Sequence, residues 1–225
     1  MRLNYSSSEE NYLKAIFHLQ QESGTVTTNA LAGKLNTRAA SVTDMMKKLH
    51  GKRLLHYRPY YGFSLTAEGK RIALHIIRRH RLWEYFLAEK LQFAWDEVHG
   101  IAEELEHVSS KKLIDKLDEY LGFPSFDPHG DPIPDSKGRM ERVERVSLAD
   151  WPAGRPAEIC HVTGQSSALL EELTQKRLGI GTQLEIKKRS SFDRSLDLKL
   201  DKGMVTVSEE LARHLLVKET EYGID

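Results

Sequence analysis

Four side chains that could bind a metal, those of His99, Glu103, Glu106 and His107, occur within nine residues of the chain. In an α-helix, with about 100° of rotation per residue, all four side chains project within an arc of roughly 100°. The apolar residues of the same stretch fill the neighbouring arc, so the four polar side chains are expected to be partly buried. Buried carboxylates beside imidazoles need a partner charge or a bound cation. This stretch therefore predicts a divalent-metal site.

A second pair with helical i, i+4 spacing, His80 and Glu84, lies on the preceding helical stretch. A single pair of this kind is more often a surface hydrogen bond, but two groups on consecutive helices favour metal binding. The donors are hard oxygens and imidazoles, which suit Mn(II), with Fe(II) as the alternative. The single cysteine, Cys160, excludes an internal disulfide and a zinc site built from several thiolates.

The sequence contains no pattern typical of an enzyme. It has no H-E-x-x-H motif, nucleophile elbow or glycine-rich phosphate loop, so neither catalysis nor an organic cofactor is expected. No apolar run approaches the roughly 18 residues of a membrane helix, and the first ten residues carry no apolar secretion signal. These features predict a cytoplasmic protein without a membrane partner.

Charge is distributed unevenly along the chain. Residues 1–90 carry 15 lysines and arginines against 7 aspartates and glutamates, whereas residues 91–225 carry 18 against 26. A basic half suits nucleic acid, because neutralising DNA phosphates releases condensed counterions. The acidic charge of the second half is compatible with binding metal cations, or it serves only to keep the protein soluble.

The elements that position these residues can be predicted from apolar periodicity and turn signals. A capped helical pattern over about residues 7–22 is followed by short helical patterns over 27–35 and 39–50, strand patterns near 54–58 and 63–65, and a helix from Thr66. This order is typical of a winged helix-turn-helix, whose second short helix enters the major groove of DNA. Some winged helices bind only proteins, but the basic charge favours double-stranded DNA. The candidate DNA-binding residues are Thr37, Arg38, Ser41, Thr43, Lys47, Lys48, Arg58 and Tyr60.

The helix from Thr66 continues to about Lys90, which is too long for a DNA-binding module alone. The apolar side chains in this region exceed what one helical pair needs for its own core; they include Trp83, Phe86, Leu87, Phe93 and Trp95. We therefore expect a homodimer through about residues 82–120, since two-fold pairing presents two recognition helices to successive major-groove segments. A polar linker follows Pro134, and residues 144–225 alternate short apolar runs with turns, which predicts a small β-barrel.

In the order and spacing of six segments, the chain resembles the metal-dependent repressors of the diphtheria toxin repressor and manganese transport regulator family. The segments are residues 10–16, 39–49, 65–69, 79–84, 98–108 and 128–134. The resemblance implies a mainly α fold with a small β part: a winged helix-turn-helix domain (1–75), an all-α dimerisation and metal-binding domain (76–140) and an SH3-like β-barrel (144–225). It implies a repressor that binds operator DNA when metal orders its first helix. The alternative is a metal-binding protein that does not regulate transcription.

The resemblance also implies two metal sites. One is matched by Glu103, Glu106 and His107, and an ancillary site is matched by His80, Glu84 and His99. The family's ligand position on the first helix is occupied by Asn11, and the place of a glutamate in the manganese branch is taken by Lys14.

Two further candidates lie later in the chain. Asp127 stands where some relatives carry a cysteine, and it is either the missing carboxylate of the first site or a turn residue. A ligand lent by the C-terminal domain is expected at Gln165, with Thr163 and Ser166 as alternatives.

Overall fold

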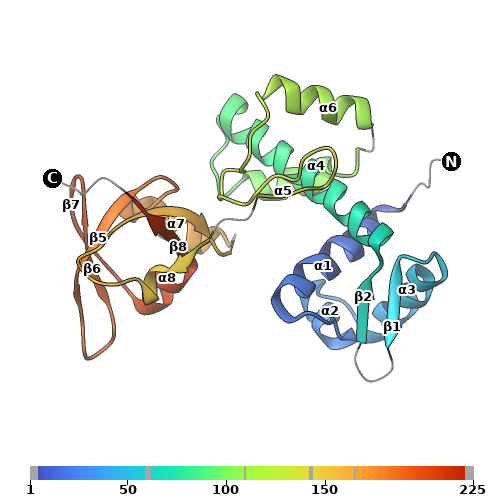
Figure 1. Cartoon of the computed structure of the whole chain (residues 1–225), viewed down its shortest axis with the longest axis horizontal. Helices are drawn as coiled ribbons and strands as arrows, with labels where there is room; N and C mark the ends of the chain where they lie inside the picture. Colours follow the sequence, from blue (N-terminus) through green and yellow to red (C-terminus); the bar gives the residue numbers. More distant parts are fainter. Residues whose placement is uncertain (1–4, 59–61, 109, 142–143, 165, 221–225) are drawn as a thin grey trace. The chain divides into compact units, whose positions relative to one another are not determined.

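The computed structural model describes residues 5–58, 62–108, 110–141, 144–164 and 166–220 (Figure 1). The chain forms two compact units, each built from several segments. The first comprises Met1–His80, Glu103–Glu119 and Pro134–Met140, and the second comprises Arg81–Ala102, Tyr120–Ile133 and Glu141–Asp225. The predicted middle domain, residues 76–140, is thus divided between the units, and the predicted boundaries stay a prediction. Among the described residues, no helix is both long and apolar enough to cross a bilayer.

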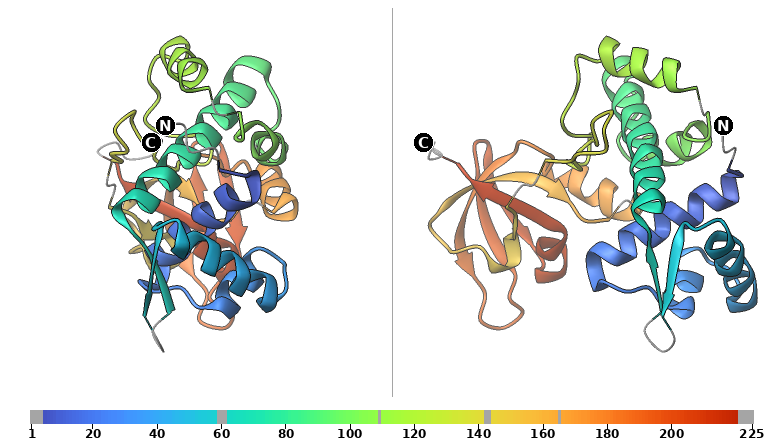
Figure 2. Two further views of the ribbon diagram at one scale, coloured as in Figure 1. Left: turned by 90° about the vertical axis from the view of Figure 1, so that its right-hand side faces the viewer. Right: turned by 45° about the vertical axis from the view of Figure 1, so that its right-hand side comes forward.

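The first unit begins with the helices α1 (Ser7–Ser23), α2 (Thr28–Lys34) and α3 (Ala39–Gly51), followed by the strands β1 (Leu55–Arg58) and β2 (Gly62–Leu65). Ser6 and Glu9 form a capping box that starts α1, and Gly24, with a φ of 77°, ends it. The strands pair antiparallel, and the views of Figure 2 show this hairpin beside α3. The order of elements is the predicted one of a winged helix-turn-helix.

Helix α4 (Ala67–Leu91) leads out of the hairpin, and α5 (Val98–Leu105) and α6 (Lys111–Tyr120) follow it. Within the first unit, the buried Arg78 of α4 lies 2.7 Å from Asp118 and 3.3 Å from Asp115, both on α6. One continuous apolar core holds α1 to α4 together. Its fully buried members include Leu13, Ile16, Val26, Val42, Leu49 and Ile76.

The second unit contains a six-stranded antiparallel sheet in the order β3-β8-β4-β5-β6-β7. Its strands are β3 (Val146–Ser147), β4 (Pro156–Val162), β5 (Gln183–Arg189), β6 (Leu196–Leu200), β7 (Gly203–Val207) and β8 (Leu215–Glu219). The helices α7 (Ser167–Lys176) and α8 (Glu209–His214) and a 3₁₀ turn (Leu148–Asp150) complete this region. Alternate strand residues, such as Ile159, Leu184 and Leu198, are fully buried in its core. A mainly α fold with a small β part is therefore confirmed.

Candidate metal centre and nucleic-acid interface

The ammonium group of Lys14 lies against the carboxylate of Glu106 in the first unit. Its Nζ donates to both Oε1 and Oε2 of Glu106 at 2.7 Å, and it lies 3.7 Å from Oε1 of Glu103. The Glu106 side chain is completely buried, and that of Lys14 is 15% exposed. The ammonium group of Lys14 thus lies beside both carboxylates, where the sequence predicts a metal ion.

His80 approaches the same buried carboxylate, with its Nδ1 2.7 Å from Oε2 of Glu106. Burial acts to raise the pKa of Glu106, but the hydrogen bond with His80 and the positive charge of Lys14 outweigh burial. The pKa of Glu106 therefore lies below its ordinary value. Glu106 is a buried, ionised carboxylate at neutral pH.

His107 is oriented by helix α1. Its Nδ1 lies 2.8 Å from Oε2 of Glu10, whose other oxygen accepts a hydrogen bond from Arg79 at 2.8 Å. A carboxylate can only accept, so the Nδ1 of His107 carries the proton of this bond and its Nε2 holds a lone pair in the neutral ring. This Nε2 lies 3.9 Å from Oε1 of Glu106. A histidine whose second nitrogen is fixed by a carboxylate has the usual arrangement of a metal ligand.

Asn11 contributes a buried oxygen from α1. Its Oδ1 accepts no hydrogen bond from any residue that the structure describes. A buried polar atom without such a bond is costly and calls for a missing partner, such as a cation or a water molecule. An amide oxygen, a carboxylate and a neutral imidazole nitrogen, as in Asn11, Glu106 and His107, are donor types that divalent cations accept.

The structure also brings together two residues predicted for the ancillary site. In the second unit, Nδ1 of His99 lies 3.0 Å from Oε1 of Glu84, which is completely buried. His80 precedes Glu84 by one turn of α4. The ligand predicted from the C-terminal domain, Gln165, lies outside the described residues.

Asp127 lies in the second unit, beside Glu84. Donor atoms of Glu84, Asp127 and His129 lie within 4.8 Å of one another, so the structure groups Asp127 with Glu84. The sequence left Asp127 open between a ligand of the site at Glu106 and a turn residue, and its role as a ligand of that site stays a prediction. His129 was missed as a candidate, and so was Glu10, although both lie in segments that carried the family resemblance.

Most of the predicted DNA-binding residues lie on or next to α3. Arg38 is the N-terminal cap of this helix, and Ser41, Thr43 and Lys47 are exposed along it. Lys48, whose side chain is 53% exposed, lies 3.2 Å from Oε1 of the buried Glu9, and its contact with DNA phosphate stays a prediction. Arg58 is exposed at the end of β1, and Tyr60 lies outside the described residues.

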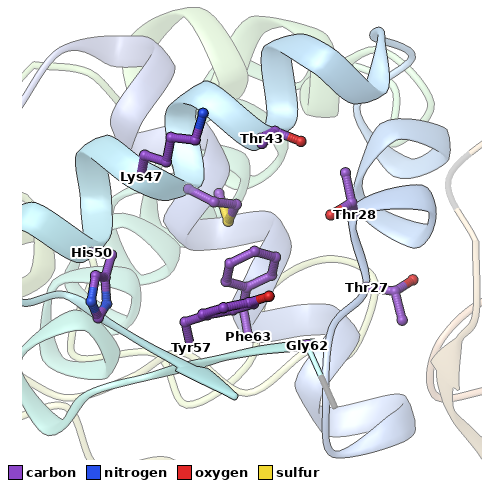
Figure 3. A pocket seen from close by; sticks show the side chains of 9 residues that line it. Thr27, Thr28, Thr43, Lys47, His50, Tyr57, Gly62 and Phe63 are labelled. Atoms are coloured by element: carbon purple, nitrogen blue, oxygen red, sulfur yellow. The ribbon is translucent and has the colours of Figure 1, made fainter. Parts of the chain in front are cut away.

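A pocket of about 470 Å³ lies between α3 and the hairpin. Figure 3 shows Thr43 and Lys47 of α3 on one side of this pocket and Tyr57 and Phe63 of the hairpin on the other. The sequence did not single out Tyr57, which is 54% exposed. The feature of the sequence that could have indicated Tyr57 is a large aromatic residue at a solvent-facing position of a short strand.

Comparisons with known proteins agree along most of the chain. Residues 4–63 match the N-terminal DNA-binding domain of iron dependent repressors, residues 66–135 match their metal binding and dimerisation domain, and residues 146–219 match the FeoA domain. The iron-dependent repressor IdeR of Mycobacterium tuberculosis is 29% identical over 157 residues, which cover 67% of this chain and 68% of IdeR. The regulator MntR of Oceanobacillus iheyensis is 33% identical over 116 residues, covering 52% of this chain and 78% of MntR.

The fold is also similar to that of solved regulators. A manganese-dependent transcriptional repressor in complex with manganese aligns with a TM-score of 0.85 and 30% identity, covering 94% of this chain and all of that one. The manganese regulator SloR aligns with a TM-score of 0.74 and 28% identity, covering 94% of this chain and 98% of that one.

Proposed function

The chain belongs to the iron-dependent repressor family, and from this membership we propose that it is a metal-dependent transcriptional repressor whose effector is Mn(II). It binds operator DNA through the winged helix-turn-helix and acts as a homodimer. Among the solved relatives, one is a manganese-dependent repressor in complex with manganese, and the curated relatives include iron-dependent repressors. Fe(II) is therefore the second candidate effector.

The observation that carries the proposal is the position of Glu106. This buried carboxylate belongs to the segment that follows α5, yet its partner Lys14 lies on α1, 92 residues earlier. The neighbouring His107 is bonded to Glu10 of the same helix. Any change in the charge or ligands at Glu106 therefore acts on the position of α1.

The residues that would hold the ion are Glu106, the Nε2 of His107 and the Oδ1 of Asn11, with Glu103 beside them. A bound divalent cation would supply two positive charges and ligand bonds that join α1 to residues 103–107. Hard oxygens with one imidazole nitrogen suit Mn(II) or Fe(II) by ligand type. Asn11 supplies a neutral oxygen and Lys14 a positive charge, so the set of donors serves one ion better than two.

Helix α1 packs in the core that also holds α3. Leu13 and Ile16 of α1 share this core with Val42 and Leu49 of α3. Fixing α1 therefore biases the placement of the recognition helix, and a ligand that favours one placement shifts the population toward it. Arg38, Thr43 and Lys47 then meet the major groove and the DNA backbone.

The test is the binding of operator DNA with and without Mn(II), followed by fluorescence anisotropy. Glu106→Gln should abolish the stimulation by metal while the fold persists, and Glu104→Gln is the matched control, because Glu104 is an exposed neighbour. Arg38→Ala should weaken DNA binding with little change in metal affinity.

Three outcomes separate the alternatives. If Glu106→Gln responds to Mn(II) like the parent protein, the effector does not act through this site. If anaerobic Fe(II) stimulates DNA binding and Mn(II) does not, iron is the effector. If the protein binds metal but no member of an operator library at any salt concentration, it is a metal-binding protein that does not regulate transcription.

A further inference from the structure

Helix α3 has one buried stripe and one outer row of residues. Val42, Met46 and Leu49 form the stripe and are buried in the core of the first unit. With about 100° of rotation per residue, the residues within roughly 30° of the direction opposite this stripe form the outer row. These residues are Ala40, Asp44 and Gly51, which are all exposed. When a recognition helix enters the major groove, its outer row comes closest to the base edges.

Asp44 supplies the functional group of this outer row. Ala40 presents only a methyl group, and a Cβ at Gly51 would meet nothing within 4 Å. Small residues on both sides let the helix backbone come close to the bases, which a side chain as short as that of aspartate requires. The side chain of Asp44 is 80% exposed, so its carboxylate is available to a ligand.

Lys47, one turn after Asp44, lies beside this carboxylate. Its Nζ lies 3.4 Å from Oδ1 of Asp44, and its side chain is 74% exposed. An exposed ion pair of this kind adds little to the stability of the fold. Next to DNA it has a different effect, because the ammonium group offsets the repulsion between the carboxylate and the phosphates. The pair therefore allows a negatively charged side chain to enter the groove.

The chemistry of the base edges limits what a carboxylate can bind in the major groove. A carboxylate accepts hydrogen bonds and donates none. Guanine presents two acceptors there, and thymine presents an acceptor and a methyl group, so neither base offers a donor. Adenine presents an amino group beside the acceptor N7, which repels a carboxylate. Cytosine presents the amino group on N4 without an acceptor on the same edge, so it is the base that fits Asp44.

We propose that Asp44 reads one cytosine in each half-site of the operator, by accepting a hydrogen bond from the N4 amino group of this base. The inference rests on the proposed function and deepens it, because it names a base of the operator and the residue that selects this base. Contacts with phosphates position a protein on DNA but carry no direct sequence information. Asp44 therefore has a role that the basic residues on and around α3 do not supply.

The experiment selects binding sites from a library of randomised double-stranded DNA, with the full chain and Mn(II), and sequences the bound fraction. The parent protein should enrich a motif with a cytosine in each half-site, and replacing this cytosine should weaken binding about 10-fold. Asp44→Asn should enrich adenine at the same position, because an amide accepts from N6 and donates to N7 of adenine. Asp44→Ala should enrich no base at that position and keep the rest of the motif.

Two controls separate a change in base reading from a change in the fold or in charge. Glu68→Gln is the matched variant, because Glu68 forms an i, i+3 ion pair with Arg71 at 2.6 Å, but on α4. It should enrich the motif of the parent. Asp44→Ala should bind DNA that lacks the motif at least as tightly as the parent does, since it removes a negative charge.

Two results would overturn this inference while the repressor function stands. Asp44→Asn and Asp44→Ala could enrich the same motif as the parent, in which case Asp44 is only a solvated charge. Asp44→Ala could weaken binding to all sequences alike, in which case Asp44 supports the helix and reads no base. If the parent enriches no motif with either Mn(II) or Fe(II), the proposed function fails and the role of Asp44 fails with it.

Discussion

Lys14 occupies a position where a divalent ion would meet Glu106, so replacing it with methionine should make the protein depend more strongly on metal. Methionine keeps most of the aliphatic length of the side chain but removes the charge. Among the described residues, His80, whose Nδ1 lies 2.7 Å from Oε2 of Glu106, then remains as the hydrogen-bonding partner of this carboxylate. Without metal, a buried charge has lost its main partner.

The magnitude follows from the burial of the two groups. Breaking a buried ion pair by removing one partner costs about 3–5 kcal/mol. Because Lys14 is 15% exposed and His80 remains beside Glu106, we expect the lower end, about 3 kcal/mol of unfolding free energy without metal. In the metal-loaded protein Lys14 no longer contacts Glu106, so the substitution costs little there. The thermodynamic cycle then requires Mn(II) to bind about 100-fold more tightly to Lys14→Met.

Urea unfolding in the presence of a chelator measures the first quantity, and calorimetric titration with Mn(II) measures the second. Lys14→Arg keeps the charge and should resemble the parent protein. Lys112→Met removes an exposed lysine of α6 and should change neither quantity. If Lys14→Met unfolds like the parent without metal and binds Mn(II) with unchanged affinity, Lys14 does not compete with metal and the reasoning is refuted.

Three other predictions follow from single contacts. Burial opposes ionisation of Glu9, but hydrogen bonds from Lys52 and from the backbone at the start of α1 outweigh burial and lower the pKa of Glu9 to about 2. The ionised Glu9 therefore contributes its full stabilisation of the fold above pH 4.5, and this stabilisation is lost as the pH falls toward 2. Glu9→Gln should therefore remove on the order of 3 kcal/mol of the acid dependence of unfolding free energy between pH 5 and 2. Gly130→Ala should cost about 2–3 kcal/mol in urea unfolding, because its Cβ would meet a carbonyl of β4, whereas Gly122→Ala, with open space around it, should cost about 1 kcal/mol. Lys47→Ala should weaken DNA binding and reduce the slope of its salt dependence by about one, as anisotropy titrations at several salt concentrations would show.

Much of the fold could be predicted from the sequence, because local rules act over a few residues. The capping box at Ser6 and Glu9, the apolar periodicity and the turn signals lead to the observed order of helices and strands in the first unit. The alternation of apolar residues after residue 144 leads to the observed antiparallel strands. The grouping of residues 76–140 could not be predicted in the same way, because it depends on which parts of the helices pack together.

For the candidate sites, helical periodicity alone predicts which residues share a helix face, such as His80 with Glu84, since 3.6 residues per turn fixes that spacing. Which partners these residues meet depends on how distant segments pack. The contact of Lys14 with Glu106 joins residues 92 positions apart, and Asp127 joins Glu84 because its loop is fixed against β4. Neither contact follows from local spacing, because packing between distant segments sets both the distance and the burial that give these charges their effect.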